Sequence, residues 1–410
     1  MLRNEIHATL WQKGMVIIMK HIVILCDGMS DLPCDELKGK TPMEVANKPN
    51  MDTLAKTSLV GLAKTVPEHL PPGSDVANLS VLGYDPSEYY SGRSPLEAAS
   101  MGIEMGAGDV ALRCNLVKLS QAERFEDAVM LSYCADDIHT PQAAEIVLQA
   151  DKEFGSEGLR FYPGISYRHC VIWKGGSLNL DLIPPHDITG KRIGDYIKEN
   201  DANRELFAIM EKSYRSFQGK QANCLWFWGE GTKANLPSFK EKFGLNASMV
   251  SAVDLLKGIG KIAEMDVLHV EGATGYIDTN FAGKADAAIQ SLKNGMDLAY
   301  IHVEAPDECG HRGEVANKVK SIELIDEIVL GKVLEAFKCG ELGTRLKILI
   351  SPDHPTPLVL KTHTREPVPF LIYDSSEAKT GVEVFDEKNS AGTGVYVAKG
   401  YELMEWFVDA

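Results

Sequence analysis

Several polar residues with metal-binding or nucleophilic side chains follow apolar segments of this chain. In Ile348–His363, an apolar run leads into Asp353 and His354, and His363 follows shortly afterwards. A buried strand delivers the next residues to the carboxyl edge of a sheet, where open α/β sheets place their chemistry. Carboxylate and imidazole groups together suit a hard-to-borderline divalent cation. Taken alone, the stretch fits a polar loop after a core strand equally well.

Two further apolar runs end in the same way. Leu298–Val303 is followed by Asp307 and His311, which are four residues apart and would share one face of a helical turn. The alternative is a helix-capping aspartate with a solvent-facing histidine. The run His21–Cys26 leads directly into Asp27, which places a third carboxylate at a strand end.

A serine lies where a helix is expected to begin. The turn Pro71-Pro72-Gly73 precedes Ser74 and Asp75, either of which could cap the following helix. The positive end of a helix dipole would stabilise an anion or phosphoester at the Ser74 hydroxyl. A plain capping serine is the alternative.

A parallel sheet would gather these strand ends at one edge, which predicts two cation sites. Asp307, His311 and His363 could hold one ion, and Asp27, Asp353 and His354 with the Ser74 hydroxyl could hold the other. Two ions about 3.5–4 Å apart would clamp a phosphoryl group and lower the pKa of Ser74 for attack. The residues therefore predict phosphoryl transfer through a phosphoserine.

Other motifs lack their defining residues. Gly39-Lys40-Thr41 resembles the end of a phosphate-binding loop, but Cys34 stands where the first glycine belongs. No Gly-x-Ser-x-Gly nucleophile elbow surrounds Ser74. We interpret Trp226 and Trp228 as aromatic packing in a buried strand, with an aromatic ligand box as the alternative.

The length and net charge of the chain limit the number of domains and the classes of partner that fit it. The chain has 410 residues, which exceeds the usual limit of roughly 250–300 for one domain. Its formal net charge of −16 argues against nucleic acid or an anionic membrane as partner. An anionic substrate would need a local cluster of arginine, lysine or metal ions. No apolar run approaches the roughly 20 residues of a membrane span.

Cysteine usage and the first residues indicate a cytoplasmic protein. The eight cysteines show no paired spacing, which is typical of reduced thiols. Residues 1–18 lack the features of a signal peptide. We interpret them as an N-terminal extension, with Met19 as the effective start.

The order of predicted elements indicates an α/β core interrupted by an insertion. Residues 110–217 show short strands with helical stretches, typical of an α+β domain. Residues 19–109 and 218–410 alternate buried strands with helices, as a mostly parallel sheet requires. The strands expected there include Cys224–Trp228, Leu298–Val303 and Leu346–Ile350, and the helices include Met43–Ser58 and Lys318–Lys338.

From Met19 onward the sequence resembles the archaeal-type, 2,3-bisphosphoglycerate-independent phosphoglycerate mutases of the alkaline phosphatase superfamily. The matching stretches are ILCDGMSD, PPGSDVANLSVLGYDP, YYSGRSPLEAAS, LRCNL, GISYRH, PPHDITG, EGATGYIDTNFAGKADAA, EAPDECGHRG, SPDHPTP and KTHTREPVPF. This resemblance implies an alkaline-phosphatase-like core with two Mn²⁺ or Mg²⁺ ions, Zn²⁺ being a further candidate, and an inserted substrate-binding cap.

The resemblance also implies residue roles and a reaction. Ser74 would be the phosphorylated nucleophile, with the two ligand sets as above. Phosphoglycerate would be held by Arg113, Asn115, Arg168, His169 and Lys284. Phosphate would pass between the 3- and 2-hydroxyls of glycerate without 2,3-bisphosphoglycerate as cofactor.

The motifs leave the substrate open. Some bacterial members of the family have been proposed as homoserine kinases, and their ligand sets would be indistinguishable from this one. A phosphoester hydrolase is another possibility within the superfamily. A non-catalytic, metal-stabilised binding protein would require Ser74 to be only a helix cap.

Overall fold

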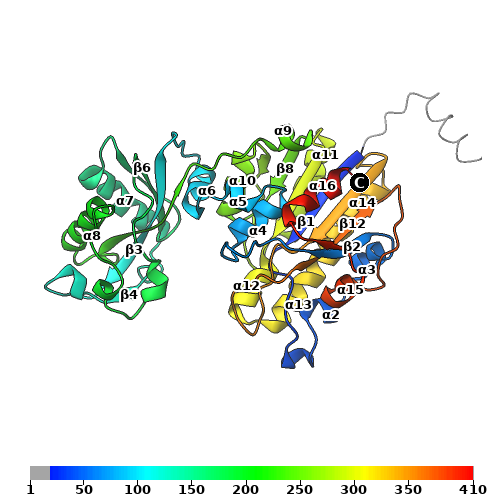
Figure 1. Cartoon of the computed structure of the whole chain (residues 1–410), viewed down its shortest axis with the longest axis horizontal. Helices are drawn as coiled ribbons and strands as arrows, with labels where there is room; N and C mark the ends of the chain where they lie inside the picture. Colours follow the sequence, from blue (N-terminus) through cyan, green and yellow to red (C-terminus); the bar gives the residue numbers. More distant parts are fainter. Residues whose placement is uncertain (1–18, 410) are drawn as a thin grey trace, which may run out of the picture. The chain divides into compact units, whose positions relative to one another are not determined.

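The computed structural model describes residues 19–409, which form two compact units (Figure 1). The larger unit comprises the described residues up to Tyr89 together with Leu236 onward, and the smaller unit is Tyr90–Asn235. The smaller unit therefore covers more of the sequence than the insertion expected at 110–217. The expected extension, residues 1–18, lies outside the described residues.

The larger unit is built on an eight-stranded sheet. The three central strands, β11 (Arg345–Ser351), β1 (Met19–Cys26) and β10 (Leu298–Val303), are parallel and almost wholly buried. Only β12 (Val368–Asp374) runs antiparallel to its neighbours, which confirms the mostly parallel α/β prediction. The full order is β13 (Tyr396–Val397), β2 (Leu59–Ala63), β12, β11, β1, β10, β8 (Ala247–Val250) and β9 (Asp266–Leu268).

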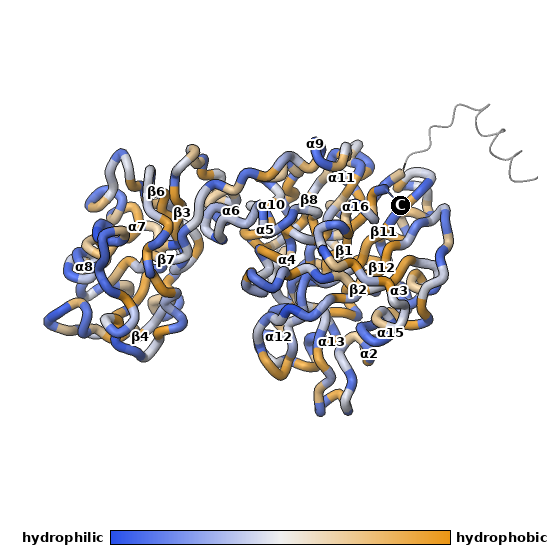
Figure 2. Tube along the Cα trace, viewed as in Figure 1, coloured by the Kyte–Doolittle hydropathy of each residue, from blue (hydrophilic) through white to orange (hydrophobic). Residues whose placement is uncertain are grey.

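Helices cover both faces of this sheet. Ile22 and Ile24 of β1 belong to a core shared with α3 (Pro49–Ala55), α11 (Phe281–Lys293), α13 (Val315–Leu324) and α14 (Gly331–Lys338). The opposite face carries α4 (Ser74–Val81) and α16 (Leu403–Asp409). Figure 2 shows β1 and β11 as largely hydrophobic segments. Other helices of this unit are α2 (Pro42–Val45), α5 (Pro86–Tyr89), α9 (Phe239–Phe243), α10 (Asp254–Ile262), α12 (Ala305–Arg312) and α15 (Glu387–Gly392).

Two long helices expected from the sequence are interrupted. Met43–Ser58 is not one helix, because the chain breaks before Pro49 and divides it into α2 and α3. The segment Lys318–Lys338 contains a π-helical stretch, Ile325–Leu330, between α13 and α14.

The smaller unit has its own antiparallel sheet. Its central strand β3 (Asp109–Leu119) pairs with β6 (Arg168–Lys174) and β7 (Cys224–Thr232). The sequence placed the β7 region in the core domain, and this was wrong, because β7 pairs with β3 along most of its length. The unit also contains α6 (Arg93–Ser100), β4 (Met130–Ser132), α7 (Thr140–Phe154), β5 (Leu159–Tyr162) and α8 (Arg204–Ser216).

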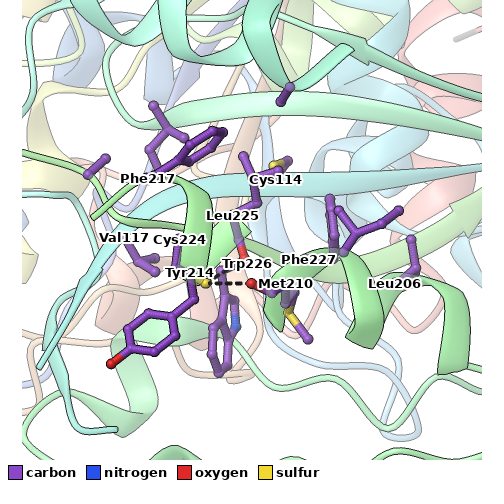
Figure 3. Close-up of a cluster of buried hydrophobic side chains, with 14 of the residues drawn as sticks. Cys114, Val117, Leu206, Met210, Tyr214, Phe217, Cys224, Leu225, Trp226 and Phe227 are labelled. Atoms are coloured by element: carbon purple, nitrogen blue, oxygen red, sulfur yellow. Dashed lines mark hydrogen bonds between the residues drawn. The ribbon is translucent and has the colours of Figure 1, made fainter. Parts of the chain in front are cut away.

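The core of the smaller unit explains where β7 belongs. Figure 3 shows Trp226 and Phe227 of β7 within an apolar cluster that includes Met210 and Tyr214 of α8. Trp226 is fully buried, and its indole nitrogen donates to the Ile183 carbonyl at 2.9 Å. These contacts favour aromatic packing over a ligand box.

All eight cysteines are unpaired. Within residues 19–409, no helix is both long and apolar enough to cross a membrane.

Candidate metal centre

The three carboxylates predicted from strand ends meet at one edge of the larger sheet. Asp27 follows β1, Asp353 follows β11, and Asp307 lies in α12 directly after β10. Since β11, β1 and β10 are parallel neighbours, their carboxyl ends are adjacent. Asp27, Asp307 and Asp353 are at most 5% exposed, so three acidic side chains are concentrated in a nearly dry site.

The first group of candidate ligands consists of Asp27, Asp353 and His354, whose donor atoms lie within 4.8 Å of one another. His354 Nε2 is 3.3 Å from Asp353 Oδ2 and 3.6 Å from Asp27 Oδ1. The Ser74 hydroxyl lies 3.1 Å from the same nitrogen. The structure therefore brings together all four residues predicted for this site.

Ser74 occupies a different position in its helix than expected. Gly73 is the N-cap, and Ser74 is the first residue of α4. Its hydroxyl is consequently not used in a capping bond and points to His354 instead. The positive end of the α4 dipole still lies beside it.

The second group contains Asp307, His311 and His363. The Nε2 atoms of His311 and His363 lie 3.4 Å and 3.3 Å from the Asp307 carboxylate. In each imidazole Nδ1 donates to a backbone carbonyl: that of Lys361 for His311 and that of Pro72 for His363. Since a carbonyl only accepts, both rings direct Nε2 toward Asp307, as ligating imidazoles commonly do.

The two groups are contiguous. His354 lies within 4.8 Å of donor atoms of both Asp307 and His363 as well as those of the first group. Its ring stacks on that of His363, with centroids 3.9 Å apart. His354 can therefore serve either position, whereas the sequence assigned it to one.

Burial sets the ionisation of these groups. Desolvation, followed by repulsion from Asp353, raises the pKa of Asp27 well above its usual value. Burial also opposes ionisation of Asp307, but hydrogen bonds from His311 and His363 hold its pKa well below the usual value. The hydrogen bond to Asp307 raises the pKa of His311 to about 9, and desolvation lowers that of His354.

The donor set fits divalent cations. Asp27 Oδ1 is buried without a hydrogen-bond partner among the described residues, which is costly for a carboxylate unless a cation faces it. Oxygen and imidazole donors match Mn²⁺, Mg²⁺ or Zn²⁺. Repulsion among the buried carboxylates would be relieved by bound positive charge.

Supporting residues that the sequence did not identify hold the ligands in place. The Thr356 hydroxyl donates to Asp307, and Asn78 Nδ2 donates to Asp353 Oδ2 at 2.8 Å. Lys318, fully buried, donates to the Thr356 carbonyl at 2.8 Å and to Asp31 at 2.6 Å. Thr356 and Lys318 lie among other polar residues, so hydrophobic periodicity gave no signal for them.

Lys318→Met is expected to destabilise the protein by about 3–5 kcal/mol, because it leaves the buried Asp31 carboxylate unpaired. Urea unfolding of the metal-free protein would measure this loss. Lys320→Met, which removes an exposed lysine two residues away, is the control and should change stability by less than about 1 kcal/mol. Equal stability of the two variants would contradict the prediction.

Four of the residues expected to contact substrate lie in the smaller unit. In the β3–β6 register Asn115 pairs with Arg168 and Cys114 pairs with His169, which places Asn115 and Arg168 on one face and His169 on the other. Arg113, on the same face as Asn115, pairs with Glu97 at 3.1 Å and lies over the Trp228 ring.

These residues differ in how available their side chains are to contact a substrate. Asn115 is already engaged, since it donates to the Tyr133 carbonyl and accepts from the Trp228 indole. Arg168 is exposed. His169 is buried, desolvation lowers its pKa to about 3, and its Nε2 has no partner among the described residues.

Lys284 belongs to α11 of the larger unit, and its ammonium donates to the His302 carbonyl at 3.0 Å. Desolvation lowers its pKa to about 8. Burial therefore makes the positive charge of Lys284 less favourable than that of an exposed lysine.

Sequence comparisons with known proteins agree on one family. The family model described as 2,3-bisphosphoglycerate-independent phosphoglycerate mutase matches residues 55–223. A relative from Geobacter sulfurreducens, described as a probable enzyme of this name, is 46% identical over 95% of this chain and 100% of its own length. The enzyme of this name from Methanosarcina acetivorans is 44% identical over 95% of this chain and 100% of its own. A solved structure from Pyrococcus horikoshii, 28% identical, covers 96% of this chain and 97% of its own, with a TM-score of 0.70.

Proposed function

This chain belongs to the 2,3-bisphosphoglycerate-independent phosphoglycerate mutase family, and from that premise we propose that it interconverts 3-phosphoglycerate and 2-phosphoglycerate through a phosphoserine at Ser74. The observation that carries the proposal is the position of the Ser74 hydroxyl. It lies at the start of α4, 3.1 Å from His354 and beside two contiguous groups of candidate ligands.

The reaction divides into two transfers. The Ser74 oxygen attacks phosphorus, and the bond from phosphorus to the 3-oxygen of glycerate breaks. After glycerate has reoriented, its 2-hydroxyl attacks the phosphoserine, and the bond to Ser74 breaks. The α4 dipole favours the transferring anion, and the start of the helix holds Ser74 in place, whereas the buried carboxylates would favour the anion only through the cations they hold.

We propose two divalent ions at this centre, Mn²⁺ or Mg²⁺, with Zn²⁺ as a further candidate. Asp307, His311 and His363 would hold one, and Asp27, Ser74, Asp353 and His354 the other. When bound, such ions neutralise phosphate charge and lower the pKa of the serine hydroxyl. The family name indicates that no 2,3-bisphosphoglycerate is required.

We propose the smaller unit as the substrate-binding cap. Arg113 and Arg168, on one face of the β3–β6 pair, supply positive charge for the carboxylate of glycerate. Asn115 and His169 are the proposed polar contacts for its hydroxyls, for which Asn115 must exchange its present hydrogen bonds and His169, buried on the other face, must become accessible. Water must be kept from the phosphoserine, because hydrolysis would convert a mutase into a phosphatase. Lys284, buried in α11 of the larger unit, is proposed as a positive charge for the phosphate. The eight unpaired cysteines support the cytoplasm as the proposed location.

The proposal is tested by a coupled assay with purified protein, Mn²⁺ and 3-phosphoglycerate, without bisphosphoglycerate, in which enolase reports 2-phosphoglycerate. We expect turnover that chelator abolishes. The same protein is offered ATP and homoserine in parallel. Phosphohomoserine without mutase turnover would overturn the proposal.

Arg168→Ala is expected to raise KM for 3-phosphoglycerate about tenfold or more, because a hydrogen bond to a charged group contributes roughly 1.5–3 kcal/mol. Initial rates over a range of substrate concentrations measure the change. Arg124→Ala removes another exposed arginine of the smaller unit and should leave KM unchanged. An unchanged KM in Arg168→Ala would remove Arg168 from the proposed contacts.

A further inference from the structure

Strand β10 carries two buried polar side chains that the mechanism does not use. Its sequence is LAYIHV, and Tyr300 and His302 are two residues apart, so they point to the same face of the sheet. Both are fully buried. Polar groups at such positions need a reason to be there, because apolar residues would pack without a desolvation cost.

His302 hydrogen-bonds to a candidate ligand. Its Nε2 lies 2.7 Å from Asp27 Oδ2, and its Nδ1 lies 3.0 Å from the Ser251 hydroxyl. An ionised Asp27, the form that binds a cation, only accepts, so Nε2 then carries a hydrogen and donates it. Ser251 is itself fixed, since its hydroxyl accepts from the Val253 amide at 3.0 Å.

This bond distinguishes the two oxygens of Asp27. Oδ2 is taken by His302, whereas Oδ1 has no hydrogen-bond partner among the described residues and lies 3.6 Å from His354 Nε2. The imidazole therefore selects Oδ1 as the atom that faces the candidate cation.

Tyr300 acts on a second candidate ligand through one intermediate. Its hydroxyl donates to Asn78 Oδ1 at 3.0 Å, which fixes the orientation of the Asn78 amide. Asn78 Nδ2 then donates to Asp353 Oδ2 at 2.8 Å. The other oxygen of Asp353 accepts from the amides of Gly28 and His354, so this carboxylate is held from both sides.

We propose that Tyr300 and His302 are positioning residues of the metal centre: from one face of β10, His302 orients Asp27 directly and Tyr300 orients Asp353 through Asn78. The inference rests on the proposed metal-dependent function and assigns the outer residues that set the geometry of one ligand group. Groups that hydrogen-bond to metal ligands typically change metal affinity or activity about 10–100-fold when they are removed.

The test measures Mn²⁺ affinity of the metal-free protein by isothermal titration calorimetry, independently of turnover. His302→Phe removes the donated hydrogen bond, whereas His302→Gln retains an N–H donor at similar reach. Tyr300→Phe and Ser251→Ala each remove a single hydroxyl, so they keep the test informative if His302→Phe does not fold.

Two controls remove comparable buried hydroxyls of the larger unit that do not contact the centre. Ser248→Ala removes a hydroxyl that bonds to Ser291 at 2.7 Å, and Tyr84→Phe removes one that donates to the Pro237 carbonyl at 3.0 Å. Thermal unfolding of the metal-free proteins reports the purely structural cost of each change.

We expect His302→Phe to weaken Mn²⁺ binding about 10–100-fold, with smaller losses in Tyr300→Phe and Ser251→Ala and partial rescue in His302→Gln. The controls should bind Mn²⁺ as the unsubstituted protein does. Affinities within about twofold of the unsubstituted protein in His302→Phe, Tyr300→Phe and Ser251→Ala would overturn the inference and leave the proposed function intact. Failure of the unsubstituted protein to bind Mn²⁺ would overturn the metal centre and this inference together.

Discussion

Ser74→Ala is expected to lower mutase turnover by about 10⁴-fold or more, because it removes the only oxygen on which the proposed phosphoserine can form. The change removes one hydroxyl at the first turn of α4, where Gly73 rather than Ser74 is the N-cap. Helix stability should therefore change little. The coupled enolase assay measures turnover directly.

Two further measurements separate loss of the nucleophile from loss of the site. Mn²⁺ should still raise the Tm of Ser74→Ala, since the carboxylates and imidazoles remain. Intact-protein mass spectrometry after incubation with 3-phosphoglycerate should detect a phosphorylated fraction in the unsubstituted protein and none in the variant. Ser87→Ala, an exposed serine of α5 in the same unit, is the matched control and should behave as the unsubstituted protein. Retained turnover in Ser74→Ala would exclude Ser74 as nucleophile.

Removal of divalent cations is expected to abolish turnover and to lower Tm together. Asp27 is buried beside Asp353, and without cations the desolvation of Asp27 and the repulsion between the two carboxylates oppose folding. A cation at 100 times its Kd would stabilise the folded state by about 2.7 kcal/mol per site. Scanning calorimetry with chelator, and then with added Mn²⁺, measures the shift.

Asp27→Asn tests the same metal dependence. Its expected effect on the stability of the metal-free protein is opposite to that of removing cations. The variant should lose the part of the Mn²⁺-induced rise in Tm that comes from the ion held by Asp27, yet its metal-free form should be at least as stable as the unsubstituted protein, because an amide at this buried position beside Asp353 has no ionised form to desolvate. Asp286→Asn, an exposed carboxylate on α11, should retain the Mn²⁺ response. A full Mn²⁺ response in Asp27→Asn would remove Asp27 from the ligand set.

The sequence was most informative where a local pattern has one structural consequence. The buried runs before Asp27, Asp307 and Asp353 were predicted as strands and are β1, β10 and β11. Parallel pairing then forces the strand ends to one edge, so the sequence alone predicts that the three carboxylates lie together. Helical spacing likewise put Asp307 and His311 on one turn of α12.

Where a sequence pattern fits two packing arrangements, the sequence alone did not decide between them. The apolar run at Cys224–Trp228 fits a strand of either sheet, and only its pairing with β3 assigns it to the smaller unit. Trp226, buried against the core of that unit, depends on contacts with residues distant in the chain. Hydrophobic periodicity identifies a strand but not its partner.

The metal and nucleophile candidates were determined by the sequence, because residue type and strand-end position are local properties. Tertiary structure alone decided their environment. It freed the Ser74 hydroxyl from capping, placed His354 within reach of both ligand groups and set Tyr300 and His302 behind the carboxylates. The physical reason is that burial and hydrogen bonding arise between residues far apart in the chain, such as Asp27 and His302, which are 275 positions apart, and Gly28 and Asp353, which are 325 apart. Such contacts exist only once the sheet has formed.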